Sequence, residues 1–344
     1  MKMTKSSYCA LIMLSSACLC GSAMAGNDEG IYYSLKNKAG QWAEQVSISG
    51  VGTSASPALS IFNGQVYMAW KGAGNDEGIY YASLNSQGLW SSQAQIPKVG
   101  TSTGPALAGF NGSLYAVWKG AGSDNGIYYA SMKNQGSWSS QASIPHVGTS
   151  STPALSAFNG SLYAVWKGVG NDGGIYYASM NNQGSWSAQT KIPKVGTSTS
   201  PALAEFNGSL YAAWKGVGND EGIYYASMNN QGSWSSQTKI PNVGSSTSVS
   251  LSGYNGFLYA AWKGAGNDDG IYYATMDNQG SWSSQAKMPK VGTSSIPALA
   301  MPFAAWKGVN SSDVVSNLVT LGKVAASTAK FITDNPEILE ALAL

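Results

Sequence analysis

The chain has 344 residues, which is long enough for one large all-β domain or for two domains of ordinary size. Charged residues make up 10% of the chain, aromatic residues 11%, and 42 residues are glycine, a composition typical of a globular, turn-rich protein rather than a disordered one. The formal net charge is +2 and the sequence contains no arginine, so nucleic-acid binding, which needs a concentrated basic surface, is disfavoured.

Residues 1–25 have the pattern of a secretory signal peptide. Lys2 and Lys5 precede an apolar run, which ends before the small-residue cleavage pattern Ala23-Met24-Ala25. The apolar run is too short to cross a membrane, so we expect a secreted protein, extracellular or periplasmic, without a membrane span. The alternative is that residues 1–25 form a buried apolar strand. All three cysteines lie in this segment, so the chain from residue 26 onward has neither disulfides nor thiolate chemistry.

The tryptophans reveal an internal repeat. One series, separated by 48 residues except for a last step of 44, comprises Trp70, Trp118, Trp166, Trp214, Trp262 and Trp306. A second series keeps a period of 48 throughout and comprises Trp42, Trp90, Trp138, Trp186, Trp234 and Trp282. Self-similarity at a period in the forties indicates a β-propeller or a solenoid.

Each repeat has the pattern of four antiparallel strands. In the unit that begins at Pro201, we expect strands at 201–206, 209–215, 223–228 and 233–240. They are separated by an Asn-Gly hairpin turn, a Gly-rich loop at 216–222 and a turn at 229–232, and they are followed by a link at 241–248. The second strand is apolar on both faces, which suits a sheet packed between two others, and the polar fourth strand suits an outer edge. This pattern is typical of a propeller blade.

The two ends of the repeat region complement each other. The chain from Gly26 opens with the third and fourth strands of a unit, at 31–48, and the repeats end at Gly308 after the first and second strands of a unit. Pairing of the two halves would close a six-bladed β-propeller over residues 26–308; another closed number of blades and an open solenoid are the alternatives. The last half-unit lacks the Asn-Gly hairpin and four residues, so we expect an irregular sixth blade.

Residues 309–344 lack the repeat. Val314, Leu318 and Leu321 recur at helical spacing, and Pro336 follows residues suited to cap a second helix. We therefore expect a short helical C-terminal tail that packs on the propeller.

Ligand-binding candidates recur on one face of the expected ring. In a four-stranded blade, the loop between the second and third strands and the link to the next blade emerge on the same face, and loops on a rigid scaffold commonly carry binding sites. Tryptophan offers a stacking surface to sugars, and lysine and aspartate offer hydrogen bonds to hydroxyl groups. The structural alternative is that tryptophan fills the space between blades and aspartate bonds the amides of its own loop. The candidates are Trp70, Lys71, Asp76, Trp118, Lys119, Asp124, Trp166, Lys167, Asp172, Trp214, Lys215, Asp220, Trp262, Lys263 and Asp268, with Asp28 expected to join Lys307 across the closure.

Catalytic residues are not indicated. General acid–base chemistry needs carboxylates in unlike surroundings, whereas nearly identical blades supply nearly identical carboxylates. His146 is the single histidine, so a histidine-rich metal site is excluded. We predict no cofactor and no metal site, although a loop calcium site built from aspartates and carbonyls stays open.

The repeat resembles that of secreted, Trp-rich β-propeller proteins, similar in architecture to fungal fucose-binding six-bladed lectins and to tectonin-type lectins. The resemblance covers residues 26–308 and rests on the motifs Tyr-Ala-Ala-Trp-Lys-Gly and Gly-Ile-Tyr-Tyr followed by Gly-Ser-Trp. Fucose lectins use an arginine, an acidic residue and aromatic residues between blades; with no arginine here, fucose specificity is not implied. Residues 275–282 also resemble a degenerate sialidase-type Asp-box, a marker of fold alone.

We therefore expect a secreted, non-enzymatic lectin or adhesin with several equivalent sites for glycans or glycosylated surfaces. Repetition favours this function because weak sites gain avidity when several of them engage one surface. A propeller glycoside hydrolase or lyase and a protein–protein interaction platform are the alternatives. The enzyme would require one blade with distinctive central carboxylates.

Overall fold

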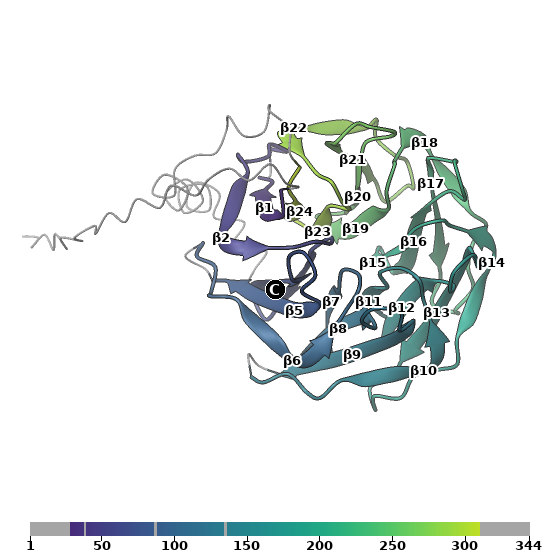
Figure 1. Cartoon of the computed structure of the whole chain (residues 1–344). Helices are drawn as coiled ribbons and strands as arrows, with labels where there is room; N and C mark the ends of the chain where they lie inside the picture. Colours follow the sequence, from purple (N-terminus) through teal and green to yellow (C-terminus); the bar gives the residue numbers. More distant parts are fainter. Residues whose placement is uncertain (1–27, 38, 86–87, 134–135, 310–344) are drawn as a thin grey trace, which may run out of the picture.

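The computed structural model describes residues 28–37, 39–85, 88–133 and 136–309. They form six four-stranded antiparallel sheets arranged as blades around a common axis (Figure 1). This arrangement confirms the six-bladed β-propeller and excludes the solenoid. The expected leader at 1–25 lies outside the described residues, and so does the expected helical tail at 309–344 apart from Val309. Among the described residues, no helix of the length and apolarity needed to cross a membrane is found.

Blade 1 contains β3 (Ala58–Phe62), β4 (Gln65–Lys71), β5 (Gly78–Leu84) and β6 (Ala94–Gly100). Blade 2 contains β7 (Ala106–Phe110), β8 (Ser113–Lys119), β9 (Gly126–Lys133) and β10 (Ala142–Gly148), and blade 3 contains β11 (Ala154–Phe158), β12 (Ser161–Lys167), β13 (Gly174–Met180) and β14 (Thr190–Gly196). Blade 4 contains β15 (Ala202–Phe206), β16 (Ser209–Lys215), β17 (Gly222–Met228) and β18 (Thr238–Gly244), and blade 5 contains β19 (Val249–Tyr254), β20 (Phe257–Lys263), β21 (Gly270–Met276) and β22 (Ala286–Gly292). Blade 6 contains β23 (Ala298–Ala300), β24 (Phe303–Lys307), β1 (Gly30–Leu35) and β2 (Val46–Gly52).

Blade 4 shows why the repeat folds as predicted. Asn207 and Gly208 both adopt positive φ, at 49° and 71°, which is the geometry of a tight hairpin turn that asparagine and glycine tolerate. β16 is buried on both faces, because the neighbouring blades cover them. Its side chains therefore alternate without a polar face, as in other sheets that are enclosed on two sides.

The outer strand differs from the prediction. Residues 233–240 were expected to form it, whereas β18 spans Thr238–Gly244 and Trp234 makes only an isolated bridge to Met228. Trp234 lies outside the strand because its ring packs on Tyr177 of blade 3. The strand continues through Pro241 because an edge strand tolerates a missing N–H group and a bulge, here marked by Asn242 at φ 57°.

The two ends of the repeat region pair as predicted. Blade 6 has the strand order β2-β1-β24-β23, with Tyr32 opposite Trp306 and Tyr33 opposite Ala305. Leu35 lies opposite Phe303, and both side chains are almost fully buried. At the equivalent places the other blades pair a serine or threonine with a tyrosine, as in Ser227 opposite Tyr211. The closing blade therefore joins its two chain segments through an apolar pair of its own.

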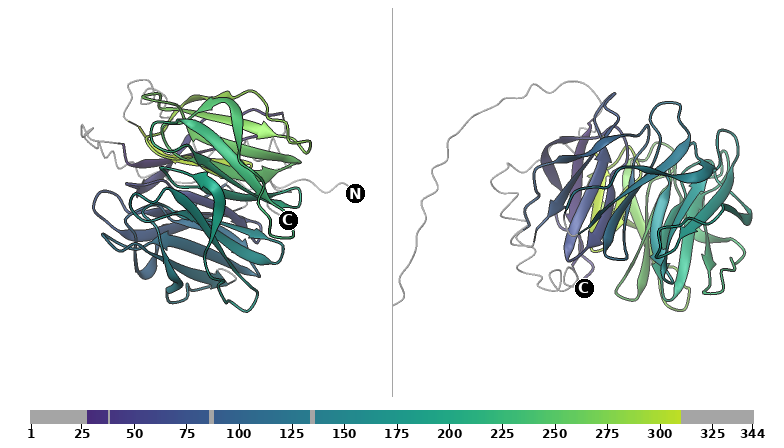
Figure 2. Two further views of the ribbon diagram at one scale, coloured as in Figure 1. Left: turned by 90° about the vertical axis from the view of Figure 1, so that its right-hand side faces the viewer. Right: turned by 90° about the horizontal axis from the view of Figure 1, so that it is seen from below.

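Aromatic side chains fill the seams between blades, which stand side by side in the two further views of Figure 2. Each tryptophan of the second series packs edge-on against a tyrosine of the preceding blade, with ring centroids 5.6–5.9 Å apart. Such edge-to-face pairs contribute about 0.5–1.5 kcal/mol each beyond the area they bury. The seams are thus held by one repeated contact.

Lys36 is an exception in the seam between blades 5 and 6. It takes the place that Leu84 or a methionine holds in the other blades, and its side chain is buried. Its Nζ lies 4.1 Å from the ring centroid of Tyr273 and 5.1 Å from that of Tyr259. Burial lowers the pKa of Lys36 to about 8, because the charged form loses its water.

We expect Lys36→Met, which restores the residue type of the other blades, to stabilise the protein at pH 7. A pKa lowered to about 8 corresponds to about 3 kcal/mol, of which cation–π attraction returns about 1–2 kcal/mol, so the expected gain is about 1–2 kcal/mol. The unfolded chain binds more protons than the folded chain between about pH 8 and 10.5, so the wild type gains stability as the pH rises and the advantage of methionine shrinks. Urea unfolding at pH 7 and pH 10 measures the gain in stability from Lys36→Met. An equal gain at both pH values would contradict a lowered pKa of Lys36.

We expect Phe303→Ala to destabilise the closing blade by about 3–5 kcal/mol, as for other buried Phe-to-Ala changes. Phe303 is 1% exposed, whereas Phe257, the first residue of β20 in blade 5, is 41% exposed and provides the matched control. Phe257→Ala should change the free energy of unfolding by about 0.5 kcal/mol or less. Denaturant unfolding of the two variants makes the comparison. Similar losses of unfolding free energy would contradict the prediction that the closing pair stabilises the protein.

Candidate functional site

The loops between the second and third strands and the links between blades meet on one face of the ring, which we call the loop face. In blade 1, Ser54 of the link donates a hydrogen bond from Oγ to the carbonyl oxygen of Gly72 at 2.9 Å. Lys71 donates from Nζ to the same Ser54 hydroxyl at 2.7 Å. Equivalent link serines in the other blades bond the equivalent glycines, so link and loop lie together around the whole ring.

The tryptophans of the first series lie inside the seams. Their side chains are 0–1% exposed, and they belong to the apolar clusters that join neighbouring blades. In this arrangement the rings of Trp70, Trp118, Trp166, Trp214 and Trp262 present no face to a ligand. Their assignment to sugar stacking stays a prediction that would require the blades to part, whereas their packing role is directly visible.

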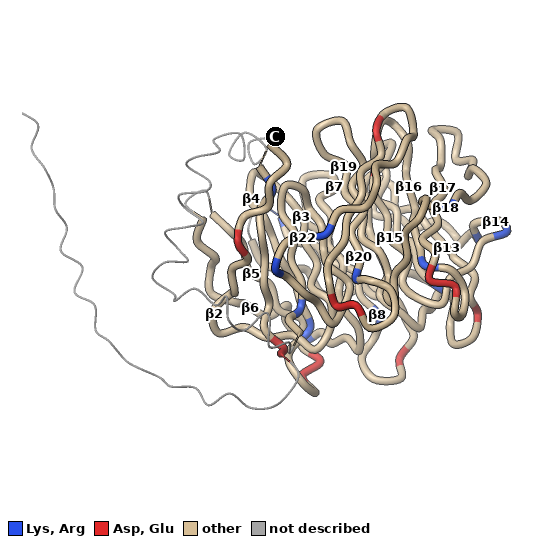
Figure 3. The backbone as a smooth tube through the Cα atoms, turned by 90° about the horizontal axis from the view of Figure 1, so that it is seen from above, with Lys and Arg blue, Asp and Glu red and all other residues tan. Residues whose placement is uncertain are grey.

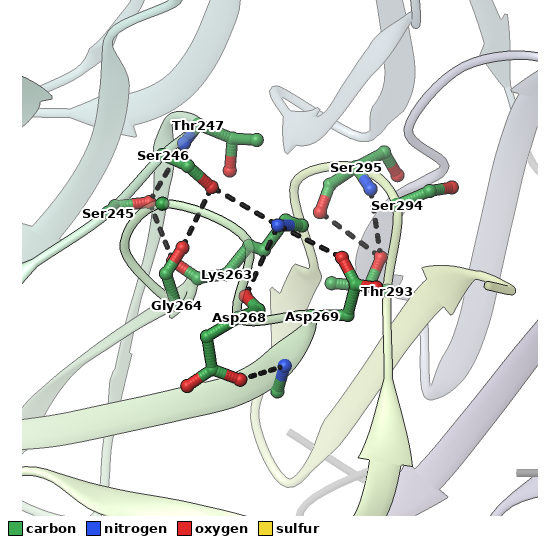
Figure 4. Close-up of polar contacts among 12 residues, drawn as sticks. Ser245, Ser246, Thr247, Lys263, Gly264, Asp268, Asp269, Thr293, Ser294 and Ser295 are labelled. Carbon is green, nitrogen blue, oxygen red and sulfur yellow. Dashed lines mark hydrogen bonds and ion pairs between the residues drawn. The ribbon is translucent and has the colours of Figure 1, made fainter. Parts of the chain in front are cut away.

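The lysines of the candidate set are also buried, and each holds its own loop. Lys71 Nζ donates to the carbonyl oxygens of Gly74 at 3.2 Å and Asp76 at 2.9 Å, in addition to Ser54. In blade 5, Lys263 bonds Ser246 Oγ and the Asp268 carbonyl and pairs with Asp269 at 3.0 Å (Figure 4). Lys119, Lys167 and Lys215 repeat this arrangement. These ammonium groups are engaged by loop carbonyls, as buried charges require.

The aspartates, in contrast, lie at the surface. Asp220 accepts a hydrogen bond from the Gly222 amide through Oδ1 at 2.8 Å and one from the Tyr224 hydroxyl through Oδ2 at 2.9 Å. The same pair of bonds is made by Asp76, Asp124, Asp172 and Asp268. The backbone bond, and next the tyrosine hydroxyl, lower the pKa of Asp220, so this carboxylate is ionised at neutral pH.

Blade 6 takes its aspartate and its lysine from the two ends of the repeat region. Asp28 accepts from the Gly30 amide at 2.8 Å and from the Tyr32 hydroxyl at 3.0 Å, and Lys307 donates to Ser294 at 3.1 Å. The residue after each lysine is glycine, and a Cβ there would collide with the aspartate; at Gly216 it would lie 2.5 Å from the Asp220 carboxyl carbon. The repeated Lys-Gly therefore allows the aspartate to approach the strand end.

The sequence analysis missed the half-buried tyrosines and the lysines beside these aspartates. Tyr176 bonds Asp172, and Lys191 of the outer strand lies over the tyrosine ring at 5.5 Å. Blade 4 repeats this group with Lys239 at 5.7 Å from Tyr224, and blade 5 repeats it with Lys287 at 5.3 Å from Tyr272. We call each such group of aspartate, tyrosine and lysine a loop-face cluster. Each of these lysines lies opposite its tyrosine on the neighbouring strand. The sequence could have indicated the clusters through this pairing, but the pairing depends on the register of the bulged outer strand.

The loop face is not perfectly sixfold. Glu77 of blade 1 accepts a hydrogen bond from the Gly122 amide of blade 2 at 2.7 Å, and Glu29 and Glu221 tie their own neighbours in the same way. Asn125 and Gly173 take the place of this glutamate before blades 3 and 4. The loops of those two blades carry Val169 and Val217, which are 45% and 60% exposed. Blades 3 and 4 thus combine an outer-strand lysine, an exposed aliphatic side chain and no glutamate tie.

Among the described residues, the central channel is lined mainly by uncharged side chains. The innermost strands line it, and a ring of leucines such as Leu107 and Leu203 narrows it. Glu205 is the single charged residue of its described lining. Elsewhere, lysines and acidic residues are interspersed around the ring (Figure 3). In the described part of the chain, no three histidine, cysteine, aspartate or glutamate side chains are grouped as metal ligands.

Comparisons with known proteins agree with this geometry at the level of the fold. No protein-family model and no curated protein sequence matches the chain. The fold is similar to that of a fucose-specific lectin from Aleuria aurantia, with a TM-score of 0.54 and 15% identity over 75% of this chain and 91% of that one. It is also similar to AofleA from Arthrobotrys oligospora (TM-score 0.54, 11% identity, 72% and 74% covered). A further similar fold is that of the NanB sialidase of Streptococcus pneumoniae (TM-score 0.56, 11% identity, 77% and 68% covered).

The architecture therefore resembles that of fungal fucose-type lectins, as expected from the sequence. At these identities, the likeness establishes a shared fold.

We expect the surface aspartates to make the protein less stable in acid. The pKa values of Asp124, Asp172 and Asp220 are lowered by folding, so their contribution is complete above about pH 4 and is lost as the pH falls through the lowered values. Changing all three to asparagine should make the fall in melting temperature between about pH 4 and pH 2 shallower. Thermal unfolding at constant ionic strength tests this, and an unchanged slope in the variant contradicts it.

Proposed function

We propose that the protein is a secreted, multivalent carbohydrate-binding protein that uses its loop-face clusters, acting as a lectin or adhesin on glycosylated surfaces. The observation that carries the proposal is the repetition of the cluster in three consecutive blades: Asp172, Tyr176 and Lys191; Asp220, Tyr224 and Lys239; and Asp268, Tyr272 and Lys287.

Each cluster offers what a sugar needs at a solvent-accessible place. The carboxylate accepts hydrogen bonds from hydroxyl groups, the ammonium donates them, and the tyrosine ring gives the apolar faces of the sugar a surface. Because Tyr224 and the Gly222 amide already hold the Asp220 carboxylate, it is fixed before a ligand arrives. Preorganisation of this kind reduces the entropy lost on binding.

Several clusters on one face favour binding to arrays of sugars. Individually weak sites gain about 100- to 10,000-fold in apparent affinity when they engage the same surface. Similarity to the Aleuria aurantia lectin supports a carbohydrate ligand, but this chain has no arginine, so we do not extend fucose specificity to it. Blades 3 and 4 are the strongest candidates, because their loops also expose Val169 and Val217.

Binding is favoured over hydrolysis on chemical grounds. The aspartates of the clusters are alike, and the lowered pKa of Asp172 and Asp220 suits them poorly to donate a proton at neutral pH. Glycosidase chemistry generally pairs two carboxyl groups with unlike pKa values, and the described lining of the channel offers Glu205 alone. Secretion is supported by the leader pattern at 1–25.

The test is a glycan array followed by calorimetric titration with the sugars that bind. We expect more than one site per chain. Changing Lys191, Lys239 and Lys287 to glutamine, the residue of blade 1, should lower the apparent affinity for a multivalent glycan by about tenfold or more.

The matched control changes Lys98, Lys194 and Lys290 to glutamine, which removes the same charge from the bulge of three outer strands. Its affinity should stay close to that of the wild type. Absence of binding across a broad array, or equal losses in both triple variants, would overturn the proposal. So would a protein partner whose capture is insensitive to free sugar.

A further inference from the structure

A cavity of about 450 Å³ lies between blades 6 and 1, where the ring closes. Its lining comes from β2 and from residues 88–93 of blade 1, and it includes Tyr33, Val46, Ile48, Val51, Leu89 and Trp90. We call it the flank groove. The volume is within the range of about 300–1,000 Å³ that binding clefts occupy. No loop-face cluster shares its residues, and the part of its lining that the structure describes carries no charged side chain.

This seam departs from the other five at three neighbouring positions. The outer strands of blades 1 to 5 carry a proline followed by lysine, histidine or asparagine, whereas β2 carries Ser49 and Gly50. The residue before the second-series tryptophan is serine or glutamine in the other blades and is Leu89 in blade 1. Leu89 is 50% exposed, which makes it one of the few large apolar side chains on the surface of the described residues.

All three differences make the edge of β2 better suited to contact with another segment. Proline in an edge strand removes an N–H group and discourages pairing with another segment, and a charged side chain there does the same. Ser49 keeps its N–H group, and Gly50 removes the long side chain found at Lys98 or Lys194. An added leucine beside such an edge would expose apolar surface unless another segment covered it.

We propose that residues 310–344 of the same chain occupy the flank groove. The described chain ends at Val309, directly after β24, and β24 lies two strands from β2 in the same sheet, so the span is about 10 Å. Lys307 and Gly52 pair with the neighbouring residues Ile31 and Gly30 of β1, so the chain leaves the sheet at the end where β2 finishes.

The composition of this segment matches the groove. Val314, Leu318 and Leu321 recur at the spacing of one helical face, and a stripe of this kind requires an apolar surface to cover it. The groove provides that surface from Val51, Leu89 and Trp90, without a charge to desolvate. The other five seams carry proline and a polar bulge residue at the same place, so the segment discriminates among seams by shape and polarity.

The experiment uses disulfide formation in the chain from residue 26, which has no native cysteine. Leu89→Cys is combined in separate variants with Val314→Cys, Leu318→Cys or Leu321→Cys. The matched controls combine the same tail changes with Ser137→Cys, the equivalent position beside a proline-bearing strand. After mild oxidation with diamide, an intrachain disulfide should form at least about tenfold faster with Leu89→Cys than with Ser137→Cys, because docking raises the effective concentration.

A second variant, again of the chain from residue 26, keeps the proposal testable if the first variants fail to fold. Ser49→Pro, Gly50→Lys and Leu89→Ser together give the groove the residues of the other seams, and they should speed the alkylation of a single Leu318→Cys thiol several-fold. The reverse changes at the seam between blades 1 and 2, Pro97→Ser, Lys98→Gly and Ser137→Leu, should leave that rate unchanged. Equal cross-linking at both seams, or disulfides formed only between two chains, would overturn the proposal; the second result would assign the groove to another copy of the protein.

Discussion

The pairing of β1 with β24 is the contact on which the rest of the structure depends. It joins the first described strand to the last one, so that every blade is covered by a neighbour on both sides. Without it, the apolar faces of two sheets would meet water, and the buried tryptophans at those faces would lose their cover. The closing strands carry the apolar pair Leu35 and Phe303, which suits a contact between segments that must find each other across the full length of the propeller.

Buried lysines and link serines hold the loops of the loop face. Each buried lysine donates hydrogen bonds to carbonyl oxygens of a Gly-rich loop. A link serine accepts from the lysine and bonds the glycine that begins the same loop. The lysines therefore stabilise the loops, while the aspartates and tyrosines are presented outward. The structural task and the binding task that we propose thus fall to side chains that are five residues apart in the sequence, such as Lys215 and Asp220.

Much of the fold could be predicted because the repeat is so regular. The tryptophan period fixed the size of the blade, Asn207-Gly208 marked a hairpin, and the complementary half-units indicated the closure that β1 and β24 confirm. The outer strand was placed too early, because Trp234 stands in an alternating pattern although its ring packs on another blade.

The candidate site was harder to predict. The tryptophans were considered as sugar contacts, yet their exposure depends on how closely the blades approach, which no local pattern contains. The grouping of Tyr176 with Lys191 depends on strand register across a bulge, and the glutamate ties depend on contacts between blades. These features appear only when the units are assembled in space.

The missing glutamate ties have a mechanical consequence. The links from Glu29, Glu77 and Glu221 brace some neighbouring loops against each other, whereas Asn125 and Gly173 leave the loops of blades 3 and 4 unbraced by this contact. Asp269 stands at this position before blade 6 and pairs with Lys263 of its own blade, so the glutamate ties reach the loops of blades 1, 2 and 5. The exposed Val169 and Val217 therefore lie on loops that no glutamate of the preceding blade holds.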